Sequence, residues 1–165
     1  MTIDRDLDCI ARQEQALCFD HFNLETAWQL GTLLHQMAAT RKLGVVIDLT
    51  LHSMPAFYAA LPGSTADNAN WVRRKRNLVL RFLKSSYCIG LQLQRQGTTC
   101  EQKFGLPLAD YAPHGGSFPI HVRQTGVIGA VTVSGLPQRD DHALVVEALA
   151  IFLKKDPLEF RFTDA

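Results

Sequence analysis

The sequence predicts a mixed α/β (α+β) fold in a single domain that spans residues 1–165. Two stretches, at residues 23–37 and 67–84, repeat apolar residues at helical spacing, which is the pattern of helices with one buried face. A continuous apolar run at residues 44–49 and a largely alternating pattern at residues 118–133 are typical of strands. A chain of this length buries roughly 70% of its unfolded surface in one core.

The N-terminal part is expected to be mainly helical. Residues 4–15 carry a short apolar face after an acidic start, which predicts a first helix. Residues 16–19 are a brief apolar run that could form an edge strand. Asn23 is then a good N-cap for a stronger helix. The run GVVIDL at residues 44–49 contains one carboxylate, Asp48, and suits a central strand covered on both faces.

The next stretch combines a weaker strand with a basic helix. Residues 54–61 are the strand candidate, and Pro62, Gly63 and Ser64 end it. In the helix expected at residues 67–84, positions 71, 75, 78 and 82 share one face. Lys75 therefore lies within an apolar stripe, and most of the arginines are expected to point to water.

Residues 85–96 fit either a helix or an alternating strand, and we favour the helix. A short helix should follow, with Thr98 and Glu101 as its capping box and Gly105 at its end. A loop at residues 108–113 leads on to the most informative segment.

That segment runs from His114 to His142. Gly115 and Gly116 allow a tight turn or a close approach of another group. Residues 118–122 alternate like a half-buried strand, and a turn at residues 124–126 joins them to a second strand rich in β-branched residues, which together predict a hairpin.

The hairpin leads into the last helix. Asp140 or Asp141 is expected to cap it, so the hairpin ends beside a helix N-terminus, where unpaired N–H groups bind anions. The tail at residues 160–162 could be an added edge strand or an interface segment.

Composition excludes several classes of function. A formal net charge of +1 gives no field that would recruit nucleic acid, and no apolar run is long enough for a membrane span. The N-terminus does not resemble a secretory signal. The four cysteines form no CxxC pair, so neither a zinc site nor a disulfide framework is indicated, and a cytoplasmic location is expected.

Several stretches, in this order along nearly the whole chain, resemble the GlcG/HbpS-like (haem-degrading domain) superfamily, in particular its uncharacterised cytoplasmic branch. They are FDHF, VVIDL, ALPGSTADNANWVRRKRN, YAPHGGSFPI and GAVTVSGLPQRDDH. The resemblance implies a profilin-like three-layer α/β/α sandwich with a mostly antiparallel, five-stranded sheet. It also implies homodimers or larger rings, and haem or a corrinoid as the cofactor of some relatives.

Each candidate ligand-binding residue has a structural alternative. His114 could ligate iron, donate to a carboxylate, or fix its own loop. His142 could bind metal or act as a base, unless the neighbouring aspartates simply cap the helix. Lys75 could anchor a carboxylate, or it could extend to water or pair with Asp48. These are also the positions at which the superfamily resemblance is most specific.

The turn residues Gly115, Gly116, Ser134 and Gly135 complete the candidate set. Ser134 lies outside a GxSxG elbow and no catalytic triad can be assembled, so nucleophilic catalysis is not expected.

The leading hypothesis is an oligomeric binding module whose partner is itself and whose ligand is haem, a corrinoid or another anionic molecule. Its pocket would lie between the His114 turn, the start of the last helix and the Lys75 face. The alternatives are a non-catalytic scaffold or assembly protein and an oxidative haem-degrading enzyme. Neither nucleic acid nor a membrane is expected as a partner.

Overall fold

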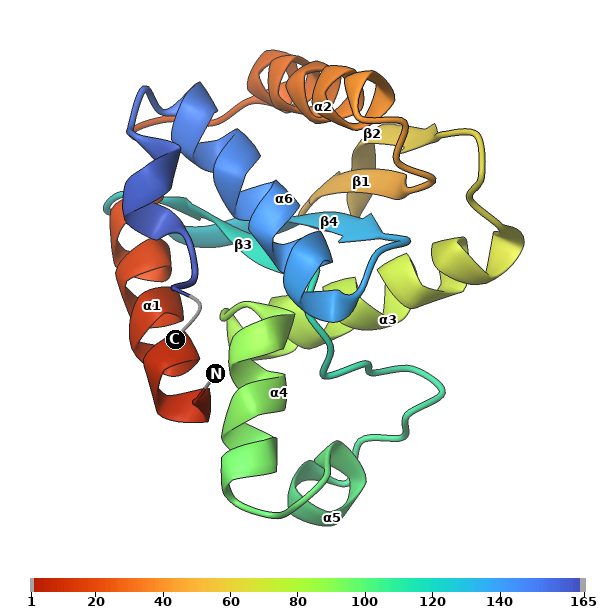
Figure 1. Cartoon of the computed structure of the whole chain (residues 1–165), viewed down its shortest axis with the longest axis vertical. Helices are drawn as coiled ribbons and strands as arrows, with labels where there is room; N and C mark the ends of the chain where they lie inside the picture. The colour runs from red at the N-terminus through yellow and green to blue at the C-terminus, as the bar shows by residue number, and fades with distance from the viewer. Residues whose placement is uncertain (1, 164–165) are drawn as a thin grey trace.

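The computed structural model describes residues 2–163, which form six α-helices, one 3-10 helix and four strands (Figure 1). The helices are α1 (Ile3–Ala16), α2 (Leu24–Thr40), α3 (Ala66–Phe82), α4 (Ser86–Arg95), α5 (Cys100–Phe104), α6 (Gln138–Phe152) and the 3-10 helix η1 (Pro157–Phe160). The strands are β1 (Val46–Leu51), β2 (Met54–Ala60), β3 (Ser117–Val122) and β4 (Gly126–Ser134). The mixed α/β class is confirmed.

The strands form one antiparallel sheet in the order β2-β1-β4-β3, so β1 is central, as its apolar run predicts. The expected fifth strand is wrong. Phe19 makes only an isolated bridge to Val122, because the chain turns toward α2 directly after it. The tail is not a strand either, since residues 157–160 coil into η1 and bury Phe160.

The two faces of the sheet differ in chemistry. One face carries Ile47, Leu49, Val131 and Val133, which pack with the buried residues of α2 and α6 in the main apolar core. The other face carries a buried polar row, because alternate residues point to opposite sides of a strand. This row consists of Asp48, Thr50, Thr132, Ser134 and Ser117.

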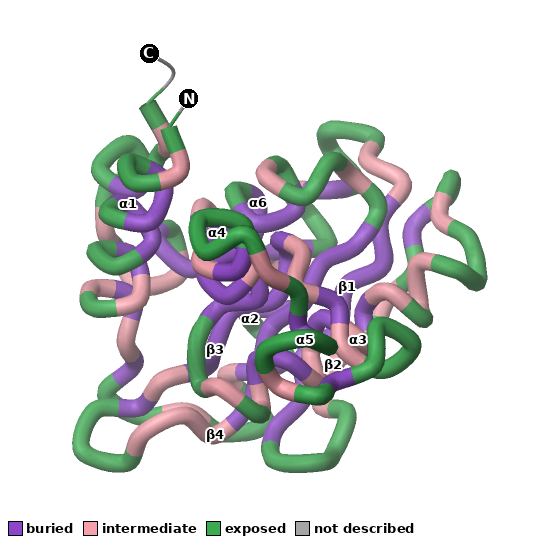
Figure 2. The backbone as a smooth tube through the Cα atoms, turned by 90° about the horizontal axis from the view of Figure 1, so that it is seen from below, coloured by how far each residue is buried: buried purple, intermediate pink, exposed green. Residues whose placement is uncertain are grey.

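Helix α3 covers the polar face. Its Arg76 donates to Asp48 at 3.0 Å, and Thr50 donates to the same carboxylate oxygen, also at 3.0 Å. The hydroxyls of Ser117 and Thr132 are bonded at 2.7 Å. Figure 2 shows the buried chain concentrated along the strands and the inner sides of the helices, with exposed residues in the outer loops.

This cover explains one incorrect prediction. β3 alternates in sequence like a half-buried strand, yet five of its six residues are buried and His121 is partly exposed. The backbone N–H of Ser117 donates to the Ser86 hydroxyl at 3.1 Å, so α4 closes the face that the alternation assigns to water.

The helix boundaries agree with the predictions except at two caps. Asn23 caps α2 through a full capping box with Thr26. The expected Thr98 and Glu101 box is wrong, because Thr99 is the N-cap of α5 and accepts from the N–H of Gln102 at 3.2 Å.

The start of α6 also differs. Neither Asp140 nor Asp141 is the N-cap, because the helix already begins after Pro137 and both aspartates lie in its first turn. The Asp141 carboxylate instead reaches back to the turn between β4 and α6.

The segment after α6 lies beside α1 (Figure 1). The side chain of Gln13 in α1 donates to the Phe160 carbonyl at 2.7 Å, which fixes the two segments to each other. Within residues 2–163, no helix combines the length and the apolar character that crossing a membrane requires.

Candidate functional site

Four of the seven predicted ligand-binding residues line one pocket of about 220 Å³. They are Lys75 from α3, His114 from the loop before β3, and Ser134 and Gly135 from the end of β4. Other residues of the wall include Asn68, Trp71, Gln138 and Asp141. The pocket thus lies between the α3 face, the His114 turn and the start of α6.

A buried ion pair forms the floor of this site. The Lys75 ammonium donates to Asp141 at 2.8 Å, and the two side chains are 4% and 1% exposed. The expected alternative partner, Asp48, is wrong because Asp48 is taken by Arg76. Burial lowers the pKa of Lys75 and raises the pKa of Asp141, while the attraction between the two charges opposes both shifts.

Asp141 is held in place from the backbone side. One carboxylate oxygen accepts the N–H of Leu136 at 2.9 Å, and the oxygen that meets Lys75 also accepts the N–H of Gly135 at 3.4 Å. Sequence reasoning treated Asp141 as a helix cap and missed this role. The signal was Lys75 itself, because a lysine in an apolar stripe needs a buried counter-charge.

His114 forms part of the pocket wall next to Trp71. The two rings meet edge to face, with centroids 5.2 Å apart. The His114 Nδ1 atom is buried and has no hydrogen-bond partner among residues 2–163. Burial lowers the pKa of His114, and the nearby charges of Lys75 and Arg74 lower it further, so the ring is neutral at pH 7.

The two glycines before β3 do not line the pocket but allow it to close tightly. A Cβ atom on Gly116, whose φ is +127°, would lie 2.4 Å from the Val133 carbonyl and 2.8 Å from Lys75 Nζ. The Gly115 N–H donates to the Gln138 side chain at 3.2 Å. Larger residues here would push the His114 loop away from the ion pair.

His142 does not belong to the pocket. It is 1% exposed, lies among the rings of Tyr87, Phe118 and Phe162, and its Nε2 atom bonds Gln13 at 2.8 Å. Because the Gln13 amide nitrogen donates to Phe160, its oxygen faces His142, so Nε2 carries the proton.

The environment of His142 also determines its charge. Burial lowers its pKa to about 3, so the ring stays neutral in the fold. In the part of the chain that the structure describes, no group of three or more His, Cys, Asp or Glu side chains could hold a metal ion.

The arginines of α3 are less exposed to water than expected. Arg73 pairs with Asp110 at 3.0 Å, and Arg74 donates to the Leu108 carbonyl at 2.6 Å while its guanidinium lies 4.5 Å from the Trp71 ring centroid. These contacts fasten the loop at residues 105–116 to α3 and so keep His114 beside Lys75.

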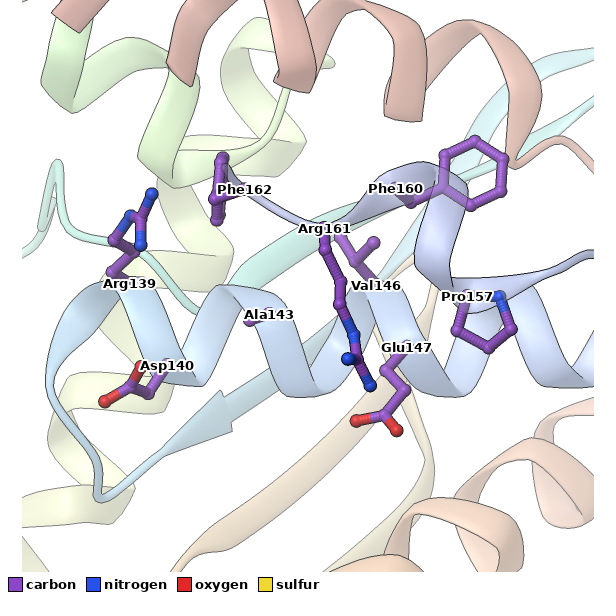
Figure 3. A pocket seen from close by; sticks show the side chains of 9 residues that line it. All are labelled: Arg139, Asp140, Ala143, Val146, Glu147, Pro157, Phe160, Arg161 and Phe162. Atoms are coloured by element: carbon purple, nitrogen blue, oxygen red, sulfur yellow. The ribbon is translucent and has the colours of Figure 1, made fainter. Parts of the chain in front are cut away.

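A second pocket, of about 200 Å³, lies between α6 and the C-terminal tail (Figure 3). Its Glu147 is already paired with Arg41 at 2.8 Å, and its Arg139 with Asp6 at 3.3 Å. Figure 3 shows Arg161 extending from the tail across α6 toward Glu147. These two side chains are already paired with residues outside the pocket, so the Lys75 pocket is the better candidate site.

Comparison with known proteins agrees with this architecture. A UPF0303 protein of Rhizobium etli is 69% identical over 156 residues, which cover 94% of each chain. The crystal structure of the Ybr137w protein is similar with a TM-score of 0.83 and 30% identity, over 90% of this chain and 87% of that chain.

A crystal structure described as a PduOC:heme complex shares the fold with a TM-score of 0.66, at 16% identity over 78% of this chain and 93% of that chain. The model of the family described as "Haem degrading protein HbpS-like" matches residues 22–150. The resemblance found in the sequence is thereby confirmed, and the chain belongs to the HbpS-like family.

Proposed function

We propose that this chain is a cytoplasmic binding module whose Lys75 pocket accepts a small anionic molecule. The observation that carries the proposal is the convergence of Lys75, His114, Ser134 and Gly135 on one pocket, although they come from three separate parts of the chain. The helices on both faces of the sheet support a profilin-like three-layer α/β/α domain as the frame of this pocket.

The charges around the pocket favour an anion. Lys75 and Arg74 both lie close enough to His114 to lower its pKa, after burial itself, so the neutral imidazole sits in a region of positive potential. Asp141 balances only one of the two cations. A carboxylate at the pocket can also meet the amides of Asn68 and Gln138 in its wall.

Haem is the cofactor that the family implies, and the pocket fits only part of it. The unpartnered Nδ1 atom of His114 is the kind of nitrogen that binds haem iron. The volume of about 220 Å³ is smaller than the roughly 300–1,000 Å³ of sites that enclose drug-sized ligands. One chain therefore does not enclose the macrocycle, and we do not propose oxidative haem degradation.

A small anion fits the volume of the pocket. The carboxylate edge of haem also fits it, if a second copy of the chain encloses the rest of the macrocycle. The description of one structural neighbour names haem, whereas none names a corrinoid among the structures compared above. The tetrapyrrole part of the proposal is therefore restricted to haem.

Self-association is a second proposal, and the exposed edge of the sheet supports it. β2 carries no charged residue, and Met54 and Tyr58 on it are 51% and 53% exposed. Trp28 of α2, 60% exposed, packs beside it on Phe57. Uncharged open edges pair readily with another strand, so a second copy is the natural cover. Such contacts also fit a scaffold or assembly protein.

The binding proposal is tested by fluorescence. The protein has two tryptophans, Trp71 in the pocket wall and the exposed Trp28. In Trp28→Phe only Trp71 reports, and titration with lactate or haem should quench it. Lys75→Arg should retain lactate quenching, and His114→Ala should lose any Soret shift caused by haem. The binding proposal is refuted if small carboxylates cause neither quenching nor a calorimetric heat and haem causes no Soret shift. The scaffold function would then remain.

A further inference from the structure

Lys75 differs from every other lysine in the chain. Of the six lysines, all within the described residues 2–163, it is the only buried one. The others, Lys42, Lys84, Lys103, Lys154 and Lys155, are exposed or half-buried. A buried lysine next to a pocket is the setting in which an ε-amine becomes a nucleophile.

The surroundings of the amine supply acceptors for two of its three N–H groups. Its Nζ atom bonds Asp141 at 2.8 Å and the Val133 carbonyl at 3.3 Å. An ammonium has three N–H groups, and within residues 2–163 no third acceptor meets this one. Gly116 makes room for the amine, because any Cβ atom there would lie 2.8 Å from Nζ.

We propose that Lys75 forms an imine with the carbonyl carbon of a small 2-oxo acid bound in the pocket. This inference rests on the proposed function and names a substrate class for the same site. Two features select the class. The positive surroundings favour the carboxylate of the oxo acid, and a pocket of about 220 Å³ suits a molecule of a few heavy atoms.

The reaction balances with groups already in place. The neutral amine attacks the carbonyl carbon, so a C–N bond forms while the carbonyl π electrons move onto oxygen. Asp141, which holds the proton taken from the ammonium, donates it to that oxygen, and its carboxylate then takes one proton from nitrogen, which gives a carbinolamine and restores the acid. A second proton from nitrogen follows the same route, the hydroxyl leaves as water, and the C=N bond forms. One amine and one carbonyl compound give one imine and one water.

The protonation behaviour of the pair is compatible with this chemistry. Burial lowers the pKa of Lys75 and raises that of Asp141, so both shifts bring the neutral amine and the neutral acid closer in free energy to the charged pair. At 2.8 Å, a single proton transfer between the two side chains exposes the amine lone pair. Asp141 is then placed to act as both general base and general acid.

Reductive trapping tests the proposal. The protein is incubated with pyruvate and cyanoborohydride and then examined by intact mass and peptide mapping. We expect one reduced pyruvate adduct, located on Lys75. Lys75→Arg should keep the charge and lose the adduct, and Asp141→Asn should slow trapping roughly 100-fold, the lower end of general acid–base catalysis. The five other lysines of the wild-type protein are an internal control for selectivity. This comparison holds even if a variant does not fold.

Four outcomes overturn the imine. An adduct spread over the exposed lysines, or trapping that persists in Lys75→Arg, would mean that Lys75 is not the selective nucleophile. Lactate has the same anionic group without the carbonyl carbon. Quenching of Trp71 by lactate and pyruvate without any adduct would refute the imine and leave the binding module intact. If neither anion binds and no adduct forms, both proposals fail.

Discussion

Replacing Lys75 with methionine tests the buried ion pair at the floor of the pocket. Methionine keeps much of the apolar stem and removes the charge, which leaves the Asp141 carboxylate buried without its cation. Breaking a buried pair from one side costs roughly 3–5 kcal/mol. The N–H groups of Leu136 and Gly135 still bond the carboxylate, so we expect the lower end, about 3 kcal/mol.

The assay is urea denaturation at pH 7.5, followed by circular dichroism, with Lys84→Met as the matched control. Lys84 is exposed, and substitutions at such positions usually change stability by no more than about 0.5 kcal/mol. Lys75→Met combined with Asp141→Asn should destabilise less than the sum of the single variants, with an interaction energy of roughly 0.5–3 kcal/mol.

The pH dependence gives an independent check. Burial already raises the pKa of Asp141, and loss of Lys75 removes the charge that opposes that rise. The folded variant therefore takes up a proton more readily than the unfolded chain, so the cost of Lys75→Met should shrink as the pH falls. If Lys75→Met is no more destabilising than Lys84→Met, the ammonium reaches solvent and the buried pair is not present.

Three further expectations concern other parts of the molecule. His142 has a folded pKa of about 3 against an ordinary value of 6.5, so stability is full above pH 6.5 and falls below it. By pH 5 the free energy of unfolding should have fallen by about 2 kcal/mol. Urea denaturation at a series of pH values checks this, and the same pH dependence of stability in His142→Leu as in the wild type would contradict it. Gly126→Ala should cost roughly 1–2 kcal/mol for its positive φ alone. Gly116→Ala also meets the Val133 carbonyl and should lower the Tm further, so equal Tm values would count against the crowding. Tyr58→Lys places a charge on the open edge of β2 and should shift the mass from light scattering toward the monomer without lowering the Tm. A wild type that is monomeric at micromolar concentration would end the self-association proposal.

Local patterns in the sequence were sufficient for most elements of the fold. Asn23 predicts the start of α2 because its side chain satisfies free N–H groups, and the capping box is present. The central position of β1 follows from the run GVVIDL, which is apolar except for Asp48 and suits a strand covered on both faces. The grouping of Lys75, His114 and Ser134 in one candidate site rested on the family resemblance, because these residues lie in its most specific stretches, and in the structure all three line the same pocket.

The choice of ion-pair partner was not predictable from sequence. Lys75 could meet Asp48 or Asp141, and only the packing of α3 on the sheet decides between them. Consecutive helical residues point about 100° apart, so Lys75 faces Asp141 while Arg76 faces Asp48. The buried state of His142 was missed for the same reason, because its neighbours Gln13 and Phe162 come from the two ends of the chain.

The polar row on the α3 side of the sheet also limits how the strands can pair. A slip of β1 by one residue would turn Asp48 and Thr50 toward the apolar layer of α2 and α6, and would turn Leu49 toward Arg76. The displaced carboxylate would lose its guanidinium and its hydroxyl donor in an environment without replacements, which is strongly unfavourable. The buried polar residues therefore act as a register lock during folding: whatever their net stabilisation, they leave the correctly aligned sheet without a close competitor.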